Sequence, residues 1–156
     1  MKVLWKKLIF ECLNSTEYCS VATVDSNGVW SNPVYFAWDQ YYNFYFLSQP
    51  QVRHMENIRK DGRVSLSIYS TKQEGDFVKG IQMEGVAHVI ENDDPDDEFF
   101  YAQKTYYART GDDKDGGMIV MNNEWSFVKI VPQKIYYFNN EIFGEERQEV
   151  PLGELR

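Results

Sequence analysis

Residues 18–38, YCSVATVDSNGVWSNPVYFAW, carry the pattern of a β-hairpin. Tyr18 to Asp25 alternates apolar and polar residues as a half-buried strand does, and Asp25-Ser26-Asn27-Gly28 is a hairpin turn. A second strand follows from Val29 to about Trp38, and its Pro33 marks an edge or a bulge because proline cannot donate to a strand ladder. The segment therefore predicts a protein built on antiparallel strands.

Further strands and helices are expected on both sides of this hairpin. The predicted strands follow runs of apolar residues that end at turn residues: Asn43–Ser48, Val64–Ser70, Phe77–Glu91, about Trp125–Val131 and Lys134–Asn139. The expected helices are Val3–Asn14, Pro50 to about Arg59, and a late one to about Arg109. Many short strands joined by tight turns favour a small antiparallel barrel of six or seven strands over a sandwich.

Two local features refine this architecture. The run Asp93-Asp94-Pro95-Asp96-Asp97-Glu98 is typical of a helix start, with a capping Asp, Pro at the first helical position and acids in the positive first turn. We therefore prefer a helix cap to a metal site for these carboxylates. Gly80 and Gly85 interrupt the long predicted strand at points where a closing barrel would bend.

The composition indicates a single domain that binds neither nucleic acid nor a membrane. The chain has 156 residues, 43% of them hydrophobic, without an apolar run long enough to span a bilayer. Its 24 acidic and 16 basic residues give a net charge of −8, whereas binding to nucleic acid requires a basic stripe. Lys6 and Lys7 interrupt the apolar start, so we expect a cytoplasmic protein without an export signal. We expect the core of the domain over about 18–139 and a charged tail over 141–156.

The sequence gives no support for catalysis by side chains alone. His54 and His88 are the only histidines, which excludes a multi-histidine metal site. Cys12 is interpreted as a small buried hydrophobe, and Cys19 has no basic neighbour that would activate its thiol. If the protein is an enzyme, a cofactor is expected to carry the reaction.

Residues 46–54, FLSQPQVRH, have the composition of an anion-binding site. A predicted strand ends at Ser48, and Arg53 and His54 stand in the first turns of the helix that follows. A hydroxyl, free helix amides and a guanidinium that converge at one point bind an anion well.

Three motifs occur in the order found in a known family. The chain resembles the pyridoxamine 5'-phosphate oxidase-like family of split barrels, and within it the YhbP-like branch of short uncharacterised bacterial proteins. The family's phosphate motif, a Thr followed after three residues by Ser-Arg-Lys, is here Ser48-Gln-Pro-Gln-Val52-Arg53-His54. Its Val-x-Val-Glu-Gly motif is here Ile81-Gln82-Met83-Glu84-Gly85. Its late Trp followed by Arg-Leu-Ala-Pro is here Trp125 to Pro132, and the similarity spans about Tyr18–Asn139.

The resemblance implies a fold, a cofactor and an assembly. The fold is a mostly β, six- or seven-stranded antiparallel split barrel of the FMN-binding type. Two copies form a homodimer, with flavin in the groove between them. The resemblance assigns the flavin phosphate to Ser48, Arg53 and His54. The candidates for contact with the flavin ring are Asn32, Pro33, Val34, Gln82 and Trp125.

Departures from the family pattern concern the substrate and the strength of FMN binding. Val52 replaces a Ser, and His54 stands where Lys is usual and is mostly neutral at pH 7, so we expect FMN to bind weakly. The oxidase's basic flavin contact on the second strand and its segment for the pyridoxal ring are missing. Oxidation of pyridoxamine phosphate is therefore not expected, and the motifs do not distinguish FMN from a deazaflavin.

Several candidate residues also have a purely structural interpretation. Arg53 can pair on the surface with an acid such as Glu56 or Glu84, and the local pattern alone slightly favours such a pair. Trp125 is more often a core residue than a ligand contact. Gln82 points away from the apolar face of its strand, toward either the flavin's polar edge or water.

As an enzyme, the protein is expected to be an FMN-dependent oxidoreductase. It would pass hydride or electrons between a reduced nicotinamide, NADH or NADPH, and a small acceptor through the flavin N5. None of its residues is an obvious general acid, although Tyr106 or Tyr107 could lean over the site. The alternatives are a non-catalytic flavin-binding or sensing module and a split barrel that has lost its flavin.

Overall fold

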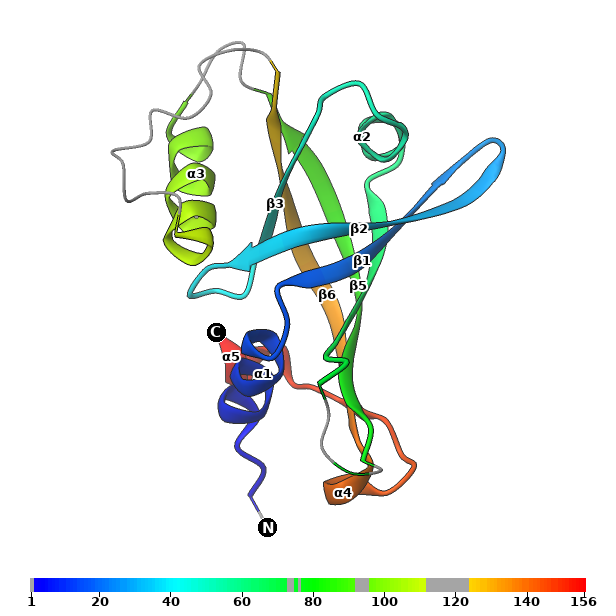
Figure 1. The fold of residues 1–156 in the computed structure, drawn as a ribbon, viewed down its shortest axis with the longest axis vertical. Helices are drawn as coiled ribbons and strands as arrows, with labels where there is room; N and C mark the ends of the chain where they lie inside the picture. The colour runs from blue at the N-terminus through cyan, green and yellow to red at the C-terminus, as the bar shows by residue number, and fades with distance from the viewer. Residues whose placement is uncertain (1, 73–74, 76, 92–95, 112–123) are drawn as a thin grey trace.

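The computed structural model describes residues 2–72, 75, 77–91, 96–111 and 124–156. Its strands form one antiparallel sheet in the order β3-β2-β1-β4-β5-β6-β7, and pairing of β3 with β6 closes six of them into a barrel (Figure 1). The strands are β1 (Tyr18–Asp25), β2 (Gly28–Trp38), β3 (Phe44–Ser48), β4 (Arg63–Tyr69), β5 (Lys79–Ile90), β6 (Ser126–Asn139) and β7 (Gln148–Glu149). The predicted fold class, a mostly β antiparallel split barrel, is confirmed.

The β1–β2 hairpin forms as its sequence predicts. Asp25 pairs with Gly28 at the end of the ladder, and Gly28 has a φ of 121°, which a side chain would rarely tolerate. Cys19, Val21 and Thr23 are buried in the barrel, whereas Ser20 and Ala22, which alternate with them, point outward. The hairpin thus has one face in the core and one face open to solvent.

The strands β5 and β6 run almost the full length of the molecule (Figure 1). The register between them shifts after Glu84, so that Gly85 pairs with Pro132 while Glu84 pairs with Lys134. Residues 126–139 therefore form one continuous strand, and the prediction of two separate strands here was wrong. The bulge absorbs Pro132, which cannot donate a ladder hydrogen bond.

Two of the predicted helix starts also need correction. The helix α2 (Arg53–Lys60) begins after Val52 rather than at Pro50, which lies in the preceding loop. The helix α3 (Asp97–Thr110) is capped by Asp96, whose carboxylate accepts from the Phe99 amide, so Asp97 is its first residue instead of the predicted proline. Residues 92–95 lie outside the described part of the chain.

The segment predicted as a charged tail packs against the barrel. It contains α4 (Asn140–Phe143), β7 and α5 (Leu152–Leu155), and it buries the side chains of Val150 and Leu155. The helix α5 contacts α1 (Trp5–Asn14) at one end of the molecule (Figure 1). The folded domain thus extends beyond the predicted core of 18–139.

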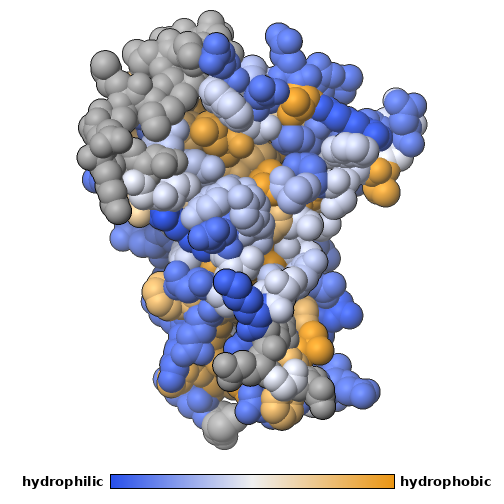
Figure 2. All heavy atoms as spheres, in the orientation of Figure 1, coloured by the Kyte–Doolittle hydropathy of each residue, from blue (hydrophilic) through white to orange (hydrophobic). Residues whose placement is uncertain are grey.

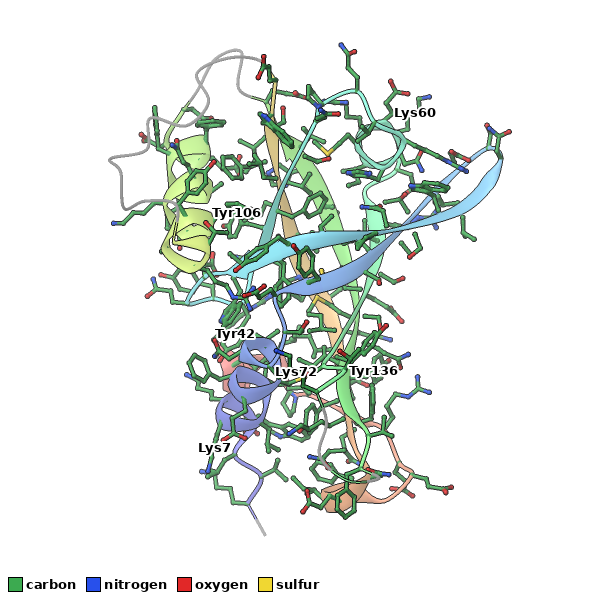
Figure 3. The ribbon with its side chains drawn as sticks, in the orientation of Figure 1. Lys7, Tyr42, Lys60, Lys72, Tyr106 and Tyr136 are labelled. Atoms are coloured by element: carbon green, nitrogen blue, oxygen red, sulfur yellow. The ribbon has the colours of Figure 1, made fainter. Side chains whose placement is uncertain are left out.

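The apolar interior has two parts, one inside the barrel and one beneath α3. The first includes Phe36, Phe44 and Phe46, and the second includes Tyr106 and Phe127. Tyr106 lies between α3 and the strands (Figure 3), and Tyr107 is buried in the same cluster. The face in Figure 2 is mostly hydrophilic, with hydrophobic side chains gathered in its upper half between α3 and α2.

The two cysteines are buried in the first of these clusters. Burial raises the pKa of both the Cys12 and the Cys19 thiol to about 12, so both are protonated at neutral pH. The interpretation of Cys12 as a small buried hydrophobe is confirmed. None of the helices in the described residues is long and apolar enough to cross a membrane.

Candidate functional site

The junction between β3 and α2 brings Ser48 and His54 together. Ser48 ends the strand, His54 lies in the first turn of the helix, and the Ser48 Oγ is 2.7 Å from the His54 Nε2. The imidazole packs against the Phe46 ring, with 6.0 Å between the ring centroids. Burial lowers the pKa of His54 from its ordinary value, so the ring is neutral at pH 7.

Arg53 is held beside this pair by Asp25 and Trp30 of the β1–β2 hairpin. Its Nε donates to the Asp25 Oδ2 at 2.8 Å, and its Nη2 donates to Oδ1 at 3.3 Å. The guanidinium carbon lies 4.6 Å from the centroid of the Trp30 ring. These hydrogen bonds lower the pKa of the Asp25 carboxyl. Arg53 thus has an acidic partner, but the partner is neither Glu56 nor Glu84.

The helix α2 is anchored to the barrel by a buried polar contact. The Asn57 amide lies 3.0 Å from the Thr23 Oγ1 on β1, and both residues are at most 3% exposed. This contact fixes the direction in which the first turn of α2 presents Arg53 and His54.

A hollow of about 610 Å³ opens where α2 begins. It is lined by Gln49, Pro50, Gln51, Val52, Glu124 and Trp125. Val52 caps the helix without a side-chain hydrogen bond, so the first helical amides have no side-chain acceptor at that position. Trp125 is 36% exposed and lines this hollow, so the interpretation of it as a core residue was wrong.

The candidate residues on β2 divide between the two faces of that strand. Val34 is buried in the core, and Pro33 is exposed on the outer face. Asn32 shares the inner face with Val34, and its Oδ1 is buried without a hydrogen-bond partner in the described part of the structure. An unpaired buried acceptor costs about 1–3 kcal/mol, which a ligand N–H would recover.

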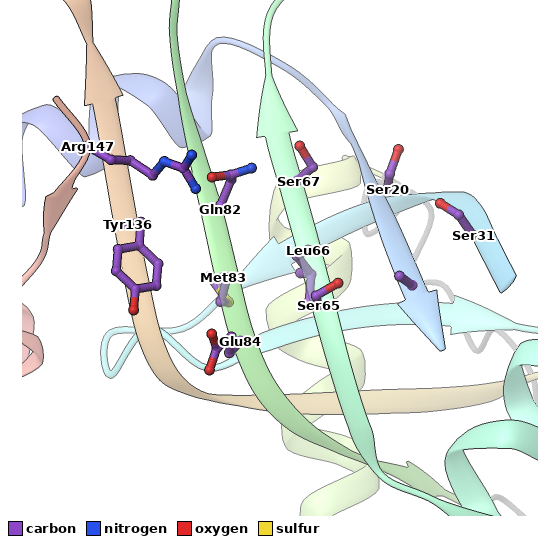
Figure 4. Close-up of a pocket in the computed structure, with 11 residues that line it drawn as sticks. Ser20, Ser31, Ser65, Leu66, Ser67, Gln82, Met83, Glu84, Tyr136 and Arg147 are labelled. Atoms are coloured by element: carbon purple, nitrogen blue, oxygen red, sulfur yellow. The ribbon is translucent and has the colours of Figure 1, made fainter. Parts of the chain in front are cut away.

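Gln82 lies on the opposite side of the sheet from the β3–α2 junction. It points outward between Ile81 and Met83, as predicted, into a hollow of about 310 Å³ on the outer face (Figure 4). Small hydroxyl side chains line the hollow on β1, β2 and β4, and Glu84, Tyr136 and Arg147 border it (Figure 4).

The candidate residues thus occupy separate places in one chain. Ser48 and His54 are in contact at the start of α2, and Arg53, the first residue of that helix, is held by Asp25 and Trp30 of the hairpin. Trp125 lines the hollow that opens where α2 begins. Gln82 and Pro33 face outward, whereas Val34 belongs to the core. Asp25 and Trp30 were not predicted as partners of Arg53, and the only signal for them in the sequence is the hairpin that carries them.

Comparisons with known proteins place this arrangement in context. The model of the pyridoxamine 5'-phosphate oxidase family matches residues 6–139. No curated protein matches the chain. A heme binding protein from Mycobacterium smegmatis superposes with a TM-score of 0.76 at 16% identity, over 99% of this chain and 61% of its own length.

Two further solved structures share the fold over nearly their full lengths. The heme storage protein HutZ from Vibrio cholerae has a TM-score of 0.68 at 20% identity, covering 86% of this chain and 94% of its own. A Clostridium acetobutylicum protein related to general stress protein 26, of the pyridoxinephosphate oxidase family, has a TM-score of 0.69 at 13% identity. The match covers 99% of this chain and 100% of that protein. At these identities the likeness is one of fold.

Proposed function

Because this chain belongs to the pyridoxamine 5'-phosphate oxidase family, we propose that it binds FMN and acts in the cytoplasm as a flavin-dependent oxidoreductase. The observation that supports this most directly is the Ser48–His54 contact in the first turn of α2, the helix that begins with Arg53. A hydroxyl, a guanidinium and uncapped helix amides are the groups that bind a phosphate monoester. The absence of the family's pyridoxal-binding segment argues for a substrate other than pyridoxamine phosphate.

The residues present fit the two ends of FMN. At the phosphate end, Arg53 uses one Nε–H and one Nη2–H on Asp25, and a guanidinium has five N–H donors. For the ring, the unpaired Asn32 Oδ1 on β2 would match a flavin N–H donor, and Trp125, in the hollow where α2 begins, would offer an exposed aromatic surface. Glu124 lines the same hollow, and its carboxylate would repel a bound phosphate, which agrees with the expected weak binding of FMN.

Each part of the site has a separate role. Ser48 and Arg53 would hold the phosphate, and His54 would orient the Ser48 hydroxyl. Asn57 holds α2 on β1 and so keeps these groups in place. Bound FMN would supply hydride and electron transfer, for which the described side chains offer no substitute. The same contacts would hold the phosphate of a deazaflavin.

The test of this proposal compares FMN with riboflavin, which has the same ring but lacks the phosphate. Arg53→Ala should weaken FMN binding about ten- to a hundredfold and leave riboflavin binding unchanged, whereas Arg53→Lys should retain part of the preference. Flavin fluorescence quenching measures both affinities. Equal FMN affinity in wild type and Arg53→Ala would defeat the assignment.

The yellow colour of the loaded protein then separates an oxidoreductase from a flavin-binding or sensing module. Bleaching by NADH or NADPH supports the oxidoreductase. A yellow protein that is bleached by neither nucleotide supports the binding module. A protein that stays colourless after addition of FMN is a split barrel without flavin.

Heme binding is a second candidate function, because two of the structural neighbours are heme proteins. His54 is half-buried and His88 is exposed, and these are the chain's two histidines. A Soret shift on addition of hemin that disappears in His54→Ala or His88→Ala would support this function. Weak, unshifted absorbance in wild type would exclude it.

A further inference from the structure

The Ser48–His54 hydrogen bond can have either of two directions. Its length of 2.7 Å leaves room for one hydrogen between the Oγ and the Nε2. When Nε2 carries no hydrogen, the Ser48 hydroxyl must donate to it and cannot donate to an anion. When Nε2 carries a hydrogen, in the neutral Nε2–H tautomer or in the imidazolium, it donates to Ser48 and the hydroxyl hydrogen becomes available. Of these two forms, only the imidazolium also places a positive charge beside the anion.

A bound phosphate would favour the second direction. It offers oxygen acceptors to the Ser48 hydroxyl and places negative charge near the imidazolium. We propose that the Ser48–His54 pair couples phosphate binding to the uptake of one proton by His54, so that FMN is held more tightly in mildly acidic solution. The inference rests on the proposed function, since FMN is the ligand.

The charged groups around α2 that the structure describes do not prevent the protonation of His54. On α2, Arg53 is paired with Asp25 of β1, and Arg59 is paired with Glu91 just after β5. The strand β2 and the strand β3 contribute no charged side chain to the junction. Among the residues that the structure describes, the other ionisable groups of α2 and of the hollow are Glu56, Lys60 and Glu124.

The sign of the pH dependence follows from this coupling. Burial depresses the pKa of His54 in the free protein, and a bound phosphate raises it again. The FMN affinity therefore increases as the pH falls from the bound-state pKa to the free-state pKa, and becomes constant below the latter. Without His54 titration, the only pH dependence would come from the FMN phosphate, whose second pKa is about 6.

The experiment measures FMN and riboflavin affinities between about pH 8 and about pH 6 at constant ionic strength. Over this range wild type should gain several-fold in FMN affinity relative to His54→Lys, since a rise of about one unit in the pKa of His54 limits the gain to about tenfold. The charge of His54→Lys is fixed, so this variant shows only the effect of the phosphate ionisation, which both proteins share. His54→Gln, which cannot titrate, should bind FMN weakly throughout. Riboflavin affinity should not change with pH in any of the three proteins.

A second measurement does not depend on the variants of His54. His88→Gln leaves His54 as the only histidine, so its imidazole can be titrated by NMR with and without FMN. FMN should raise the pKa of His54 by about one unit, and riboflavin should leave it unchanged. An unchanged pKa, or a phosphate preference that does not vary with pH, would overturn the inference and leave the proposed function standing. No FMN binding by wild type or His54→Lys at any pH would overturn both.

Discussion

Arg53 is bound on both sides by the protein itself, by the Asp25 carboxylate and by the Trp30 ring. A phosphate that approaches Arg53 meets the negative charge of Asp25 at close range. Asp25→Asn should therefore strengthen FMN binding by up to about tenfold and leave riboflavin binding unchanged. The measurement is flavin fluorescence quenching at low salt.

Asp61→Asn is the matched control for this substitution, because Asp61 also pairs with an arginine, Arg63, away from the β3–α2 junction. It removes the same charge and should not change the FMN affinity. If Asp25→Asn weakens FMN binding, Asp25 positions Arg53 for the phosphate instead of competing with it.

Gly85 occupies a place where no side chain fits. A Cβ there would lie 2.9 Å from the Ile130 Cγ2 and 3.0 Å from the Val131 carbonyl oxygen. Gly85→Val should therefore lower the free energy of unfolding by more than about 1 kcal/mol, measured by urea denaturation. Glu84→Val adds the same side chain at an exposed position of the same strand and should have a much smaller effect. Equal stability of Gly85→Val and wild type would refute the close approach.

At the residue scale, the sequence predicts features that depend on near neighbours in the chain. Gly85 as a bend and Asp25-Ser26-Asn27-Gly28 as a turn follow from backbone sterics within a few residues. The Arg53–Asp25 pair joins residues 28 positions apart, so its formation depends on how α2 packs on the hairpin. Glu56 was the local choice, whereas Glu84, 31 positions from Arg53, would have needed a packing that the sequence does not specify.

At the scale of elements, Arg109 connects three segments that no strand ladder joins. Its guanidinium donates to the carbonyl oxygens of Leu13, at 3.0 Å, Thr16, at 2.7 Å, and Phe36. It also lies over the rings of Phe36 and Trp38. Burial lowers the pKa of Arg109, although the guanidinium stays charged at neutral pH.

Arg109→Lys keeps the charge but cannot present several donors in a plane. It should lower the free energy of unfolding by about 2–4 kcal/mol, because buried carbonyl groups lose their donors. Lys104→Gln on the exposed side of α3 should change it by less than about 0.5 kcal/mol. Equal urea midpoints for the two variants would show that Arg109 does not hold α1, β2 and α3 together.

The observed bounds of the helices and strands agree with the predicted ones where a single residue pattern determines them. The strand β1 forms over the predicted residues, whereas α2 begins three residues after Pro50. Proline fits the first helical turn but also fits a loop, and Val52 is the residue that caps the helix. The strand β6 runs through Pro132 because a bulge next to it, at Gln133, shifts the register against β5, and β5 is far away in the sequence.

At the scale of the molecule, closure of the barrel depends on pairing of β3 with β6. Phe44 pairs with Ile130, and Ser48 pairs with Ser126, across about half of the chain length. Alternating patterns predict that each strand exists, but they do not determine its partner. The resemblance to a family of split barrels supplied this part of the fold.

The outer face of the barrel has the features of a contact between two copies. Small side chains on β1 and β4, Ser20, Ala22, Ser65 and Ser67, line its hollow and permit close approach. Glu84 and Arg147 border the same hollow. Under two-fold symmetry, Glu84 of one copy can face Arg147 of the other copy, and the reverse contact forms at the same time. We propose that the chain forms a homodimer through this face.

The proposed dimer is tested by measuring the oligomeric state of the wild type and of single-substitution variants. The wild type should sediment as a dimer at micromolar concentration, with an interface of more than about 2,000 Å². Ser67→Arg places a long charged side chain in the centre of the face and should give a folded monomer, because an unpaired charge there must be desolvated. Ser26→Arg makes the same change in the exposed hairpin turn and should remain dimeric. A wild type that stays monomeric with FMN present would refute the dimer, and a dimeric Ser67→Arg would place the interface on another face.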